Sequence, residues 1–310
     1  MGFFNKEQYQ GYNIYSMKKY VDKKRVILNM IICIIVIITL SFVIYYTIDT
    51  TIRLRKTKQF TAQVVEYQKE KEEQEQAKIK QQEIDKQAKI PKLTDKGKEN
   101  IKNIYHSETK RAFLTFDDGP SKNTKDILDI LNQNNIKATF FVLGSQVEVF
   151  PETTNRIYNE GHYIANHGYS HQYSKIYESP AQVLNEYNQC NQIVAKTINV
   201  PEYNSHLFRF PGGSVGGKYE NVKNQAISLL EQNNILYVNW NSLTGDSEKS
   251  NPTEEYLMNN LQQTTNEKNS VIILMHDSQA KKITVDCLPK VIEYLRQQGY
   301  EFFNFYDIIK

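Results

Sequence analysis

The sequence contains few cysteines. Only three of its 310 residues are cysteine, and one of them, Cys33, lies within a long apolar run. At most one disulfide could therefore join Cys190 to Cys287, and the chain has neither a disulfide framework nor a cysteine-rich metal site. An excess of charge of one sign is also missing, because the formal net charge is only +3. So small a charge argues against a nucleic-acid-binding protein.

One long apolar run dominates the N-terminal part of the chain. Residues 26–48 contain no charged side chain, and about 20 such residues are enough to cross the hydrocarbon core of a bilayer as a helix. The run is long for a cleavable signal peptide, and no small-residue cleavage site follows it. We therefore expect a retained transmembrane anchor rather than a buried core helix.

Basic residues flank this run on both sides. Those before it are Lys18, Lys19, Lys23, Lys24 and Arg25, and those after it, further away, are Arg53, Arg55, Lys56 and Lys58. Positive charge favours the cytoplasmic side of a membrane. The sequence therefore predicts a cytoplasmic basic tail of residues 1–25 and a main domain on the outer side.

A polar segment follows the anchor. Residues 63–90 are rich in Glu, Gln, Lys and Ala and contain neither Gly nor Pro, a composition that favours a helix. We expect residues 49–106 to form a helical stalk and linker, of which residues 63–90 would extend about 40 Å if helical. The apolar residues keep no sustained heptad, which favours a solvated helix over a coiled-coil dimer.

Strand-like and helix-like segments alternate from about residue 107. The short apolar, strand-like segments are 112–116, 138–144, 163–167, 207–212, 236–240, 271–276 and 302–306. Helix-like stretches between some of them are 124–135, 180–196 and 285–299. This alternation indicates parallel β/α units. Seven such strands could close a barrel or form an open sheet.

Polar residues lie within or just after five of the strands. They are Asp117 and Asp118, His167 and His171, Arg209, Asp246, and His276. Each alone has an ordinary explanation as a turn or loop residue. In a β/α barrel, however, the C-terminal ends of the strands meet on one face, where active sites form. The convergence of these residues therefore predicts an active site.

The two histidines of this set have the spacing of metal ligands. His171 lies four positions after His167, which places both side chains on one face of a helix or tight turn. The metalloprotease motif has the same spacing, but Gly168 stands where that motif has Glu. A catalytic zinc typically has three protein ligands, and an aspartate from the first strand end could be the third. Of Asp117 and Asp118, one would then bind the metal and the other would transfer protons.

Five motifs occur in the order found in one known family. They are LTFDDGPS (114–121), NHGYSH (166–171), RFPGG (209–213), the segment Trp240–Asp246, and ILMHD (273–277). Over residues 108–310 the sequence resembles the NodB-type polysaccharide deacetylases, carbohydrate esterase family 4. The resemblance implies a distorted (β/α) barrel with about seven strands for a catalytic domain of residues 107–310. The transmembrane helix and helical stalk that precede it have no counterpart in this family.

The resemblance assigns roles to ten residues. The metal ligands, usually of Zn²⁺, are Asp118, His167 and His171. The catalytic residues are the general base Asp117, Arg209 that orients it, the general acid His276, and Asp246 that tunes the acid. The substrate-binding residues are Gly212, whose backbone N–H would face the oxyanion, together with Leu274 and Trp240.

The sequence departs from the family pattern mainly where sugars bind. Gly212 stands where many relatives carry an aromatic residue, Ser247 where Trp is common, and Leu243 where Asp is frequent. These departures leave sugar recognition open. Asp118 is present, whereas a branch of the family that acts on N-acetylmuramic acid lacks this aspartate.

The combined features predict a membrane-anchored, extracellular, zinc-dependent deacetylase. The expected reaction removes N-acetyl groups from N-acetylglucosamine residues of a cell-wall polysaccharide, with peptidoglycan as the expected polymer and acetate as a product. The alternatives are a deacetylase of another N-acetylglucosamine polymer, such as an exopolysaccharide or a chitin-like chain, and an O-acetyl esterase of the same family. A different class, a catalytically silent wall-glycan-binding protein, would be expected to lack a ligand or the acid–base pair.

Overall fold

The computed structural model describes residues 14–309, with side chains from residue 23 onward. Residues 1–13 of the predicted basic tail lie outside the described residues. The chain divides into two compact units, one up to Lys80 and one from Gln81.

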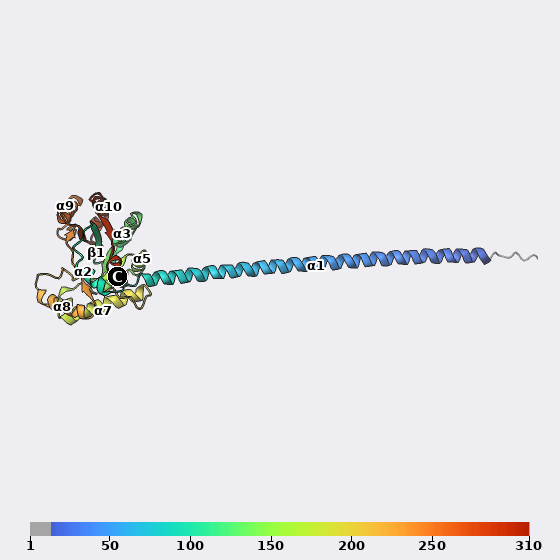
Figure 1. Ribbon diagram of the computed structural model, residues 1–310, viewed down its shortest axis with the longest axis horizontal. Helices are drawn as coiled ribbons and strands as arrows, with labels where there is room; N and C mark the ends of the chain where they lie inside the picture. Colours follow the sequence, from blue (N-terminus) through green and yellow to red (C-terminus); the bar gives the residue numbers. More distant parts are fainter. Residues whose placement is uncertain (1–13, 310) are drawn as a thin grey trace, which may run out of the picture. The chain divides into compact units, whose positions relative to one another are not determined.

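One helix, α1 (Ile14–Ala88), accounts for all of the described chain up to Lys80 (Figure 1). It contains the predicted anchor and nearly all of the helix-forming segment 63–90 without interruption. Its N-terminal part includes a stretch that is long and apolar enough to cross a membrane, and none of that stretch is buried. Both segments are therefore helical, as predicted.

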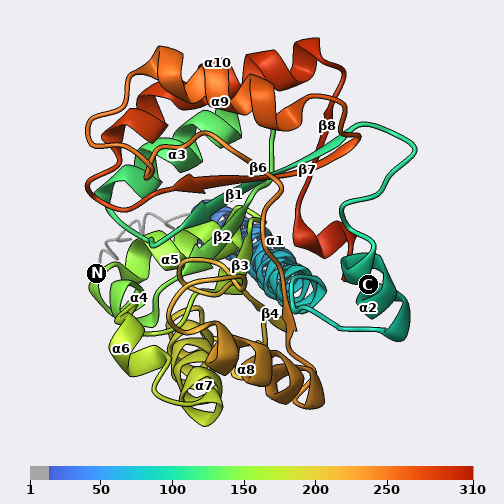
Figure 2. The same cartoon turned by 90° about the vertical axis from the view of Figure 1, so that its left-hand side faces the viewer.

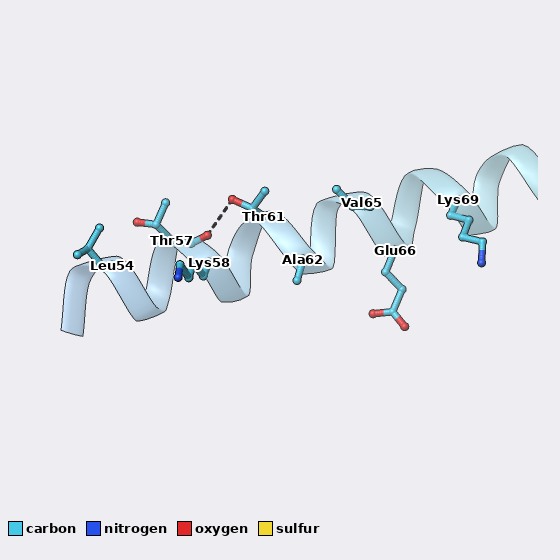
Figure 3. Close-up of a pocket in the computed structure, with 8 residues that line it drawn as sticks. All are labelled: Leu54, Thr57, Lys58, Thr61, Ala62, Val65, Glu66 and Lys69. Atoms are coloured by element: carbon cyan, nitrogen blue, oxygen red, sulfur yellow. Dashed lines mark hydrogen bonds between the residues drawn. The ribbon is translucent and has the colours of Figure 1, made fainter. Parts of the chain in front are cut away.

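A shallow hollow lies on α1 between Leu54 and Lys69 (Figure 3). All of its lining side chains come from α1, and the hydrogen bond among them, from Thr61 Oγ1 to the Thr57 carbonyl, is internal to the helix. Within the described part of this unit no second element faces the hollow. We therefore assign it no ligand.

The second unit is built on one parallel sheet. Its strands are β1 (Arg111–Asp117), β2 (Thr139–Val142), β3 (Tyr163–Asn166), β4 (Leu207–Phe208), β5 (Leu236–Tyr237), β6 (Ser242–Leu243), β7 (Ser270–His276) and β8 (Glu301–Phe303). The order is β5-β4-β3-β2-β1-β7-β6, and β8 pairs with the first half of β1. Among residues 14–309 no pairing joins β5 to β6, so the barrel is open there. The predicted distorted (β/α) barrel is thus confirmed, and β6 is a short strand that the sequence did not reveal.

Helices surround this sheet. They are α2 (Asp95–Lys102), α3 (Lys122–Gln133), α4 (Gly144–Val149), α5 (Pro151–Asn159), α6 (Tyr173–Ile176), α7 (Pro180–Thr197), α8 (Glu220–Gln232), α9 (Glu254–Thr265), α10 (Lys282–Gln297) and the 3₁₀ turn η1 (Phe305–Asp307). Figure 2 shows α3, α9 and α10 on one side of β1 and β7, with α7 and α8 on the other side. The three helices expected from the sequence correspond to α3, α7 and α10.

The pleat of β1 sends alternate side chains to two different cores. Ala112, Leu114 and Phe116 pack outward in the larger core, which includes residues of α3 and α10. Phe113 packs in a second, inner core. Because side chains two positions apart share one face of a strand, Asp117 at the end of β1 lies on the same inner face as Phe113.

The segment before β1 belongs to this folded unit. Ile101 and Ile104 are buried in the inner core together with Phe113 and Ile309. Gly97 lies against Ile309, because a Cβ atom there would come within 2.1 Å of the Ile309 carbonyl oxygen. The folded unit therefore begins upstream of residue 107, and the extent of the catalytic domain within it stays a prediction.

Candidate active site

Asp117 and His276 end two adjacent parallel strands. The register of β1 and β7 makes them direct partners. Asp117 is only 2% exposed, and His276 lies beside it at the C-terminal end of the sheet. Two groups that can exchange protons are thus held by the central strands of the barrel, on the face where β/α barrels carry active sites.

Arg209 holds one oxygen of Asp117. Its Nη1 donates to Asp117 Oδ1 at 2.8 Å and to Thr115 Oγ1 at 2.8 Å, and its guanidinium lies 3.9 Å from the centre of the Phe141 ring. Arg209 is fully buried. Burial raises the pKa of Asp117, and the Arg209 charge opposes that rise. The pair fixes Oδ1 and leaves Oδ2 directed toward the His167 ring, 3.8 Å from Nε2.

Asp118, His167 and His171 converge on one point. Asp118 Oδ1 lies 3.5 Å from His167 Nε2 and 3.3 Å from His171 Nε2, and one ligand atom from each residue fits within 4.8 Å. Ligand atoms at 2.0–2.2 Å from a tetrahedral Zn²⁺ are about 3.3–3.6 Å apart. Asp118 Oδ1 is buried and has no hydrogen-bond partner among the described residues. The donor set and the orphaned oxygen therefore fit a divalent cation.

The backbone and a hydrogen bond orient these three side chains. Asp118 and His171 adopt φ angles of 74° and 55°, a region that costs non-glycine residues on the order of 1 kcal/mol or more. His167 Nδ1 lies 2.7 Å from the Arg209 carbonyl oxygen. That contact makes Nδ1 the donor and leaves the Nε2 lone pair free. Burial lowers the pKa of His167 to about 3, so its imidazole is neutral.

Asp246 binds His276 at two points. Asp246 Oδ1 lies 2.8 Å from His276 Nδ1, while Oδ2 accepts hydrogen bonds from the His276 backbone N–H and from Thr284 Oγ1, both at 2.7 Å. Burial acts to lower the pKa of His276, but the hydrogen bond and charge of Asp246 outweigh it and raise that pKa to about 9. The arrangement therefore keeps His276 protonated near neutral pH, as a general acid requires.

A cleft of about 380 Å³ joins these groups, within the size range of small-molecule sites. Nine of the ten site residues expected from the sequence line it: Asp117, Asp118, His167, His171, Gly212, Trp240, Asp246, Leu274 and His276. Arg209 is the tenth and lies behind Asp117. Leu274 lies two residues before His276 on β7. Its side chain is 8% exposed and adds an apolar surface to the cleft.

Sequence reasoning missed several residues near this cleft, among them Thr284 and Tyr173. Thr284 contributes a hydrogen bond to Asp246 from the first turn of α10, seven positions after the ILMHD motif ends. Tyr173 also lines the cleft, two residues beyond His171. Tyr173 could have been found from its closeness to the histidine motif, whereas nothing in the sequence indicated a role for Thr284.

The open (β/α) barrel thus brings Asp117 and His276 beside an Asp-His-His cluster whose donor set fits a divalent cation. Comparison with known proteins identifies the family. The polysaccharide deacetylase profile matches residues 105–230, and a peptidoglycan-N-acetylglucosamine deacetylase of Bacillus cereus is 31% identical over 205 residues, 64% of this chain and 71% of that protein. The chain belongs to the polysaccharide deacetylase family, whose N-deacetylases hydrolyse amide bonds.

Solved structures agree with this assignment. A Streptococcus mutans esterase of carbohydrate esterase family 4 superposes with a TM-score of 0.60 at 29% identity, covering 66% of this chain and 89% of that one. The catalytic domain of a peptidoglycan N-acetylglucosamine deacetylase from Eubacterium rectale gives a TM-score of 0.59 at 29% identity, covering 64% of this chain and 90% of that one. The fold of this chain is therefore the fold of carbohydrate esterase family 4.

Proposed function

We propose that this protein is a membrane-anchored, metal-dependent deacetylase that removes N-acetyl groups from N-acetylglucosamine residues of peptidoglycan on the outer side of the membrane. One observation carries the proposal. The orphaned Asp118 Oδ1 faces the Nε2 atoms of His167 and His171, and a base and an acid lie beside this cluster in the same cleft.

Asp117 is the proposed general base. Arg209 holds its Oδ1, so Oδ2 is the oxygen available to take a proton from the attacking water. The raised pKa of this carboxyl, caused by burial, strengthens it as a proton acceptor. Because Arg209 is itself anchored by Thr115 and the Val238 carbonyl, the base keeps one orientation during the reaction.

His276 is the proposed general acid. Asp246 Oδ1 accepts a hydrogen bond from the His276 Nδ1–H, so the Nε2 proton is the one delivered to the departing amine as the C–N bond breaks. Gly212 lines the same cleft, and we assign its backbone N–H to the developing oxyanion. Leu274 and Trp240 supply the apolar surface that we assign to the acetyl group and the sugar.

Asp118, His167 and His171 are the proposed ligands of a divalent cation, with Zn²⁺ as the expected ion. When bound, such a cation polarises the acetyl carbonyl and acidifies water. The Arg209 carbonyl orients His167 for this role through Nδ1, as hydrogen bonds behind metal ligands commonly do.

The polymer and the location are inferred from different observations. Relatives named as peptidoglycan-N-acetylglucosamine deacetylases support peptidoglycan as the substrate. The apolar stretch of α1 supports a single membrane span over residues 26–48, which would hold the catalytic domain of residues 107–310 near the cell wall through a stalk and linker of residues 49–106. The basic tail of residues 1–25 would remain in the cytoplasm.

Acetate release by the full chain in detergent tests this function. The substrates are de-O-acetylated peptidoglycan and N-acetylglucosamine oligomers, before chelation, after chelation and after Zn²⁺ is restored. We expect release that is lost on chelation and regained with Zn²⁺. Release that is insensitive to chelation would exclude the metal-dependent mechanism, and a preference for the oligomers over peptidoglycan would exclude the proposed polymer.

A second candidate is hydrolysis of O-acetyl esters, because the superposed Streptococcus mutans protein is described as an esterase. The same acid–base pair could serve both reactions, but an ester oxygen leaves with less help from an acid than an amine does. Assays of O-acetylated and N-acetylated polymers side by side decide between them. Ester hydrolysis without N-deacetylation would show that the substrate is an O-acetyl ester and not an N-acetyl amide.

A further inference from the structure

Two adjacent glycines make room for two aromatic rings at the cleft. A Cβ atom on Gly212 would lie 2.7 Å from the Tyr173 hydroxyl, and one on Gly213 would lie 3.2 Å from Trp240 Cη2. Both glycines have positive φ angles, 74° and 78°. The two glycines therefore leave space for the rings of Tyr173 and Trp240, which come from other segments of the chain.

Tyr173 begins α6, two residues after His171. Its ring centre lies 5.5 Å from that of His171, and the residue lines the cleft while 42% of its surface remains exposed. A ring in this position is adjacent to the proposed metal ligands and still accessible to a substrate.

A buried neighbour holds this ring in place. Tyr177 meets Tyr173 edge-on, with ring centres 5.9 Å apart. The Tyr177 hydroxyl donates to the Pro211 carbonyl at 2.7 Å, directly before Gly212. This hydrogen bond links the segment of Tyr173 and Tyr177 to the segment of Pro211 and Gly212. The Tyr173 ring is therefore positioned before a ligand binds.

Among residues 23–309 the structure gives the Tyr173 hydroxyl no hydrogen bond to protein, whereas the Tyr177 hydroxyl donates to the Pro211 carbonyl. A phenol that is partly desolvated and lies at a cleft commonly receives its partner from the ligand. Sugar rings offer hydroxyl groups for such a bond and C–H faces for contact with an aromatic ring.

We propose that Tyr173 is a specificity-determining residue that contacts the pyranose of the acetylated glycan through its ring and its hydroxyl, across the cleft surface made by Gly212 and Gly213. This inference rests on the proposed function, since it assigns part of that same site to sugar recognition. Trp240 supplies the second ring of this recognition surface. A side chain at position 212 would displace Tyr173. The Tyr173 and Trp240 rings therefore take the place of a side chain at Gly212.

Kinetics of the full chain in detergent test the role of Tyr173. The probe is an N-acetylglucosamine tetramer, and the variants are Tyr173→Ala and Tyr173→Phe. Loss of one aromatic contact and one hydrogen bond should raise KM about tenfold in Tyr173→Ala, and loss of the hydrogen bond alone should raise it about threefold in Tyr173→Phe. We expect kcat and the bound-metal content to remain at the parent level in both.

Tyr294→Ala is the matched control, because Tyr294 is a partly buried tyrosine of α10 that packs near Thr265 and does not line the cleft. Its KM should equal that of the parent. An unchanged KM in Tyr173→Ala would overturn the inference, and so would a loss of metal, which would assign Tyr173 a structural role beside His171.

The failure of this inference is distinguishable from failure of the proposed function. If the parent releases acetate and Tyr173→Ala has the same KM, the function stands and the role of Tyr173 is wrong. If the parent binds the tetramer without releasing acetate, the dissociation constants of parent and variant decide the role of Tyr173 by themselves. If the parent neither binds nor hydrolyses the tetramer, both proposals fail.

Discussion

Asp117 and His276 are direct partners in the register of β1 and β7. Consequently, the proposed base and the proposed acid are carried by the two most extensively paired strands of the sheet rather than by flexible loops. Arg209 fixes the first through a buried hydrogen bond and Asp246 fixes the second through a partly buried one, each 2.8 Å long. Under the proposed mechanism, such support preorganises proton transfer on both sides of the scissile bond.

Replacement of the proposed base should stop catalysis without removing the metal. In Asp117→Asn the side chain keeps its shape but cannot take a proton, so we expect acetate release to fall by about 10²–10⁴-fold. Zinc content and turnover, measured on the same preparation, check this. Asp126→Asn, an exposed position on α3, should leave both unchanged. Unchanged turnover in Asp117→Asn would remove Asp117 as the base.

The pH dependence should report the Asp246–His276 pair. A general acid must be protonated, so kcat/KM should decline as pH rises through the pKa of His276, which Asp246 raises above its usual value of 6.5 to about 9. Asp246→Asn removes the charge that raises this pKa. We expect the alkaline limb of the kcat/KM profile to move to lower pH in this variant.

Asp286→Asn serves as the control for that profile, because Asp286 is exposed on α10 and pairs only with Lys282 in the described chain. Its alkaline limb should coincide with that of the parent. If the limb of Asp246→Asn also coincides with that of the parent, His276 is not the group whose deprotonation limits the reaction.

Removal of the buried guanidinium should destabilise the fold as well as the site. Arg209→Leu leaves the Asp117 carboxylate buried without its partner, and breaking a buried ion pair in this way typically costs about 3–5 kcal/mol. Urea unfolding at neutral pH measures the loss. Arg156→Leu removes a more exposed arginine that pairs with Asp129 and Glu160 and should cost about 1 kcal/mol or less. Equal losses in the two variants would contradict the buried-pair account.

The apolar run of residues 26–48 should determine whether the protein is in the membrane or in the soluble fraction. A chain lacking residues 1–48 loses the whole apolar run and should move from the membrane to the soluble fraction, whereas a chain lacking only residues 1–25 should stay in the membrane. Fractionation by ultracentrifugation after a carbonate wash separates these outcomes. Protease added to intact cells should cut the stalk between residues 63 and 90, and complete protection of the stalk would reverse the proposed orientation.

The sequence alone was sufficient to predict most of the sheet and which polar residues gather at one end of it. Apolar runs and helix-forming stretches were sufficient to predict the seven strand segments and the helices α3, α7 and α10, because these patterns are local. The motifs at the strand ends were sufficient to predict that Asp117, Asp118, His167, His171 and His276 would meet, because parallel strands of one barrel expose their C-terminal ends on one face.

Only the tertiary structure decided how the sheet and the cleft are completed. The strand β6 has two residues, too few for a periodic signal, and the gap between β5 and β6 depends on long-range pairing. Thr284 reaches Asp246 from 38 residues away, and Tyr173 occupies the space beside Gly212, 39 positions along the chain. Such contacts follow from the packing of separate layers, and packing between distant segments leaves no pattern in the local sequence.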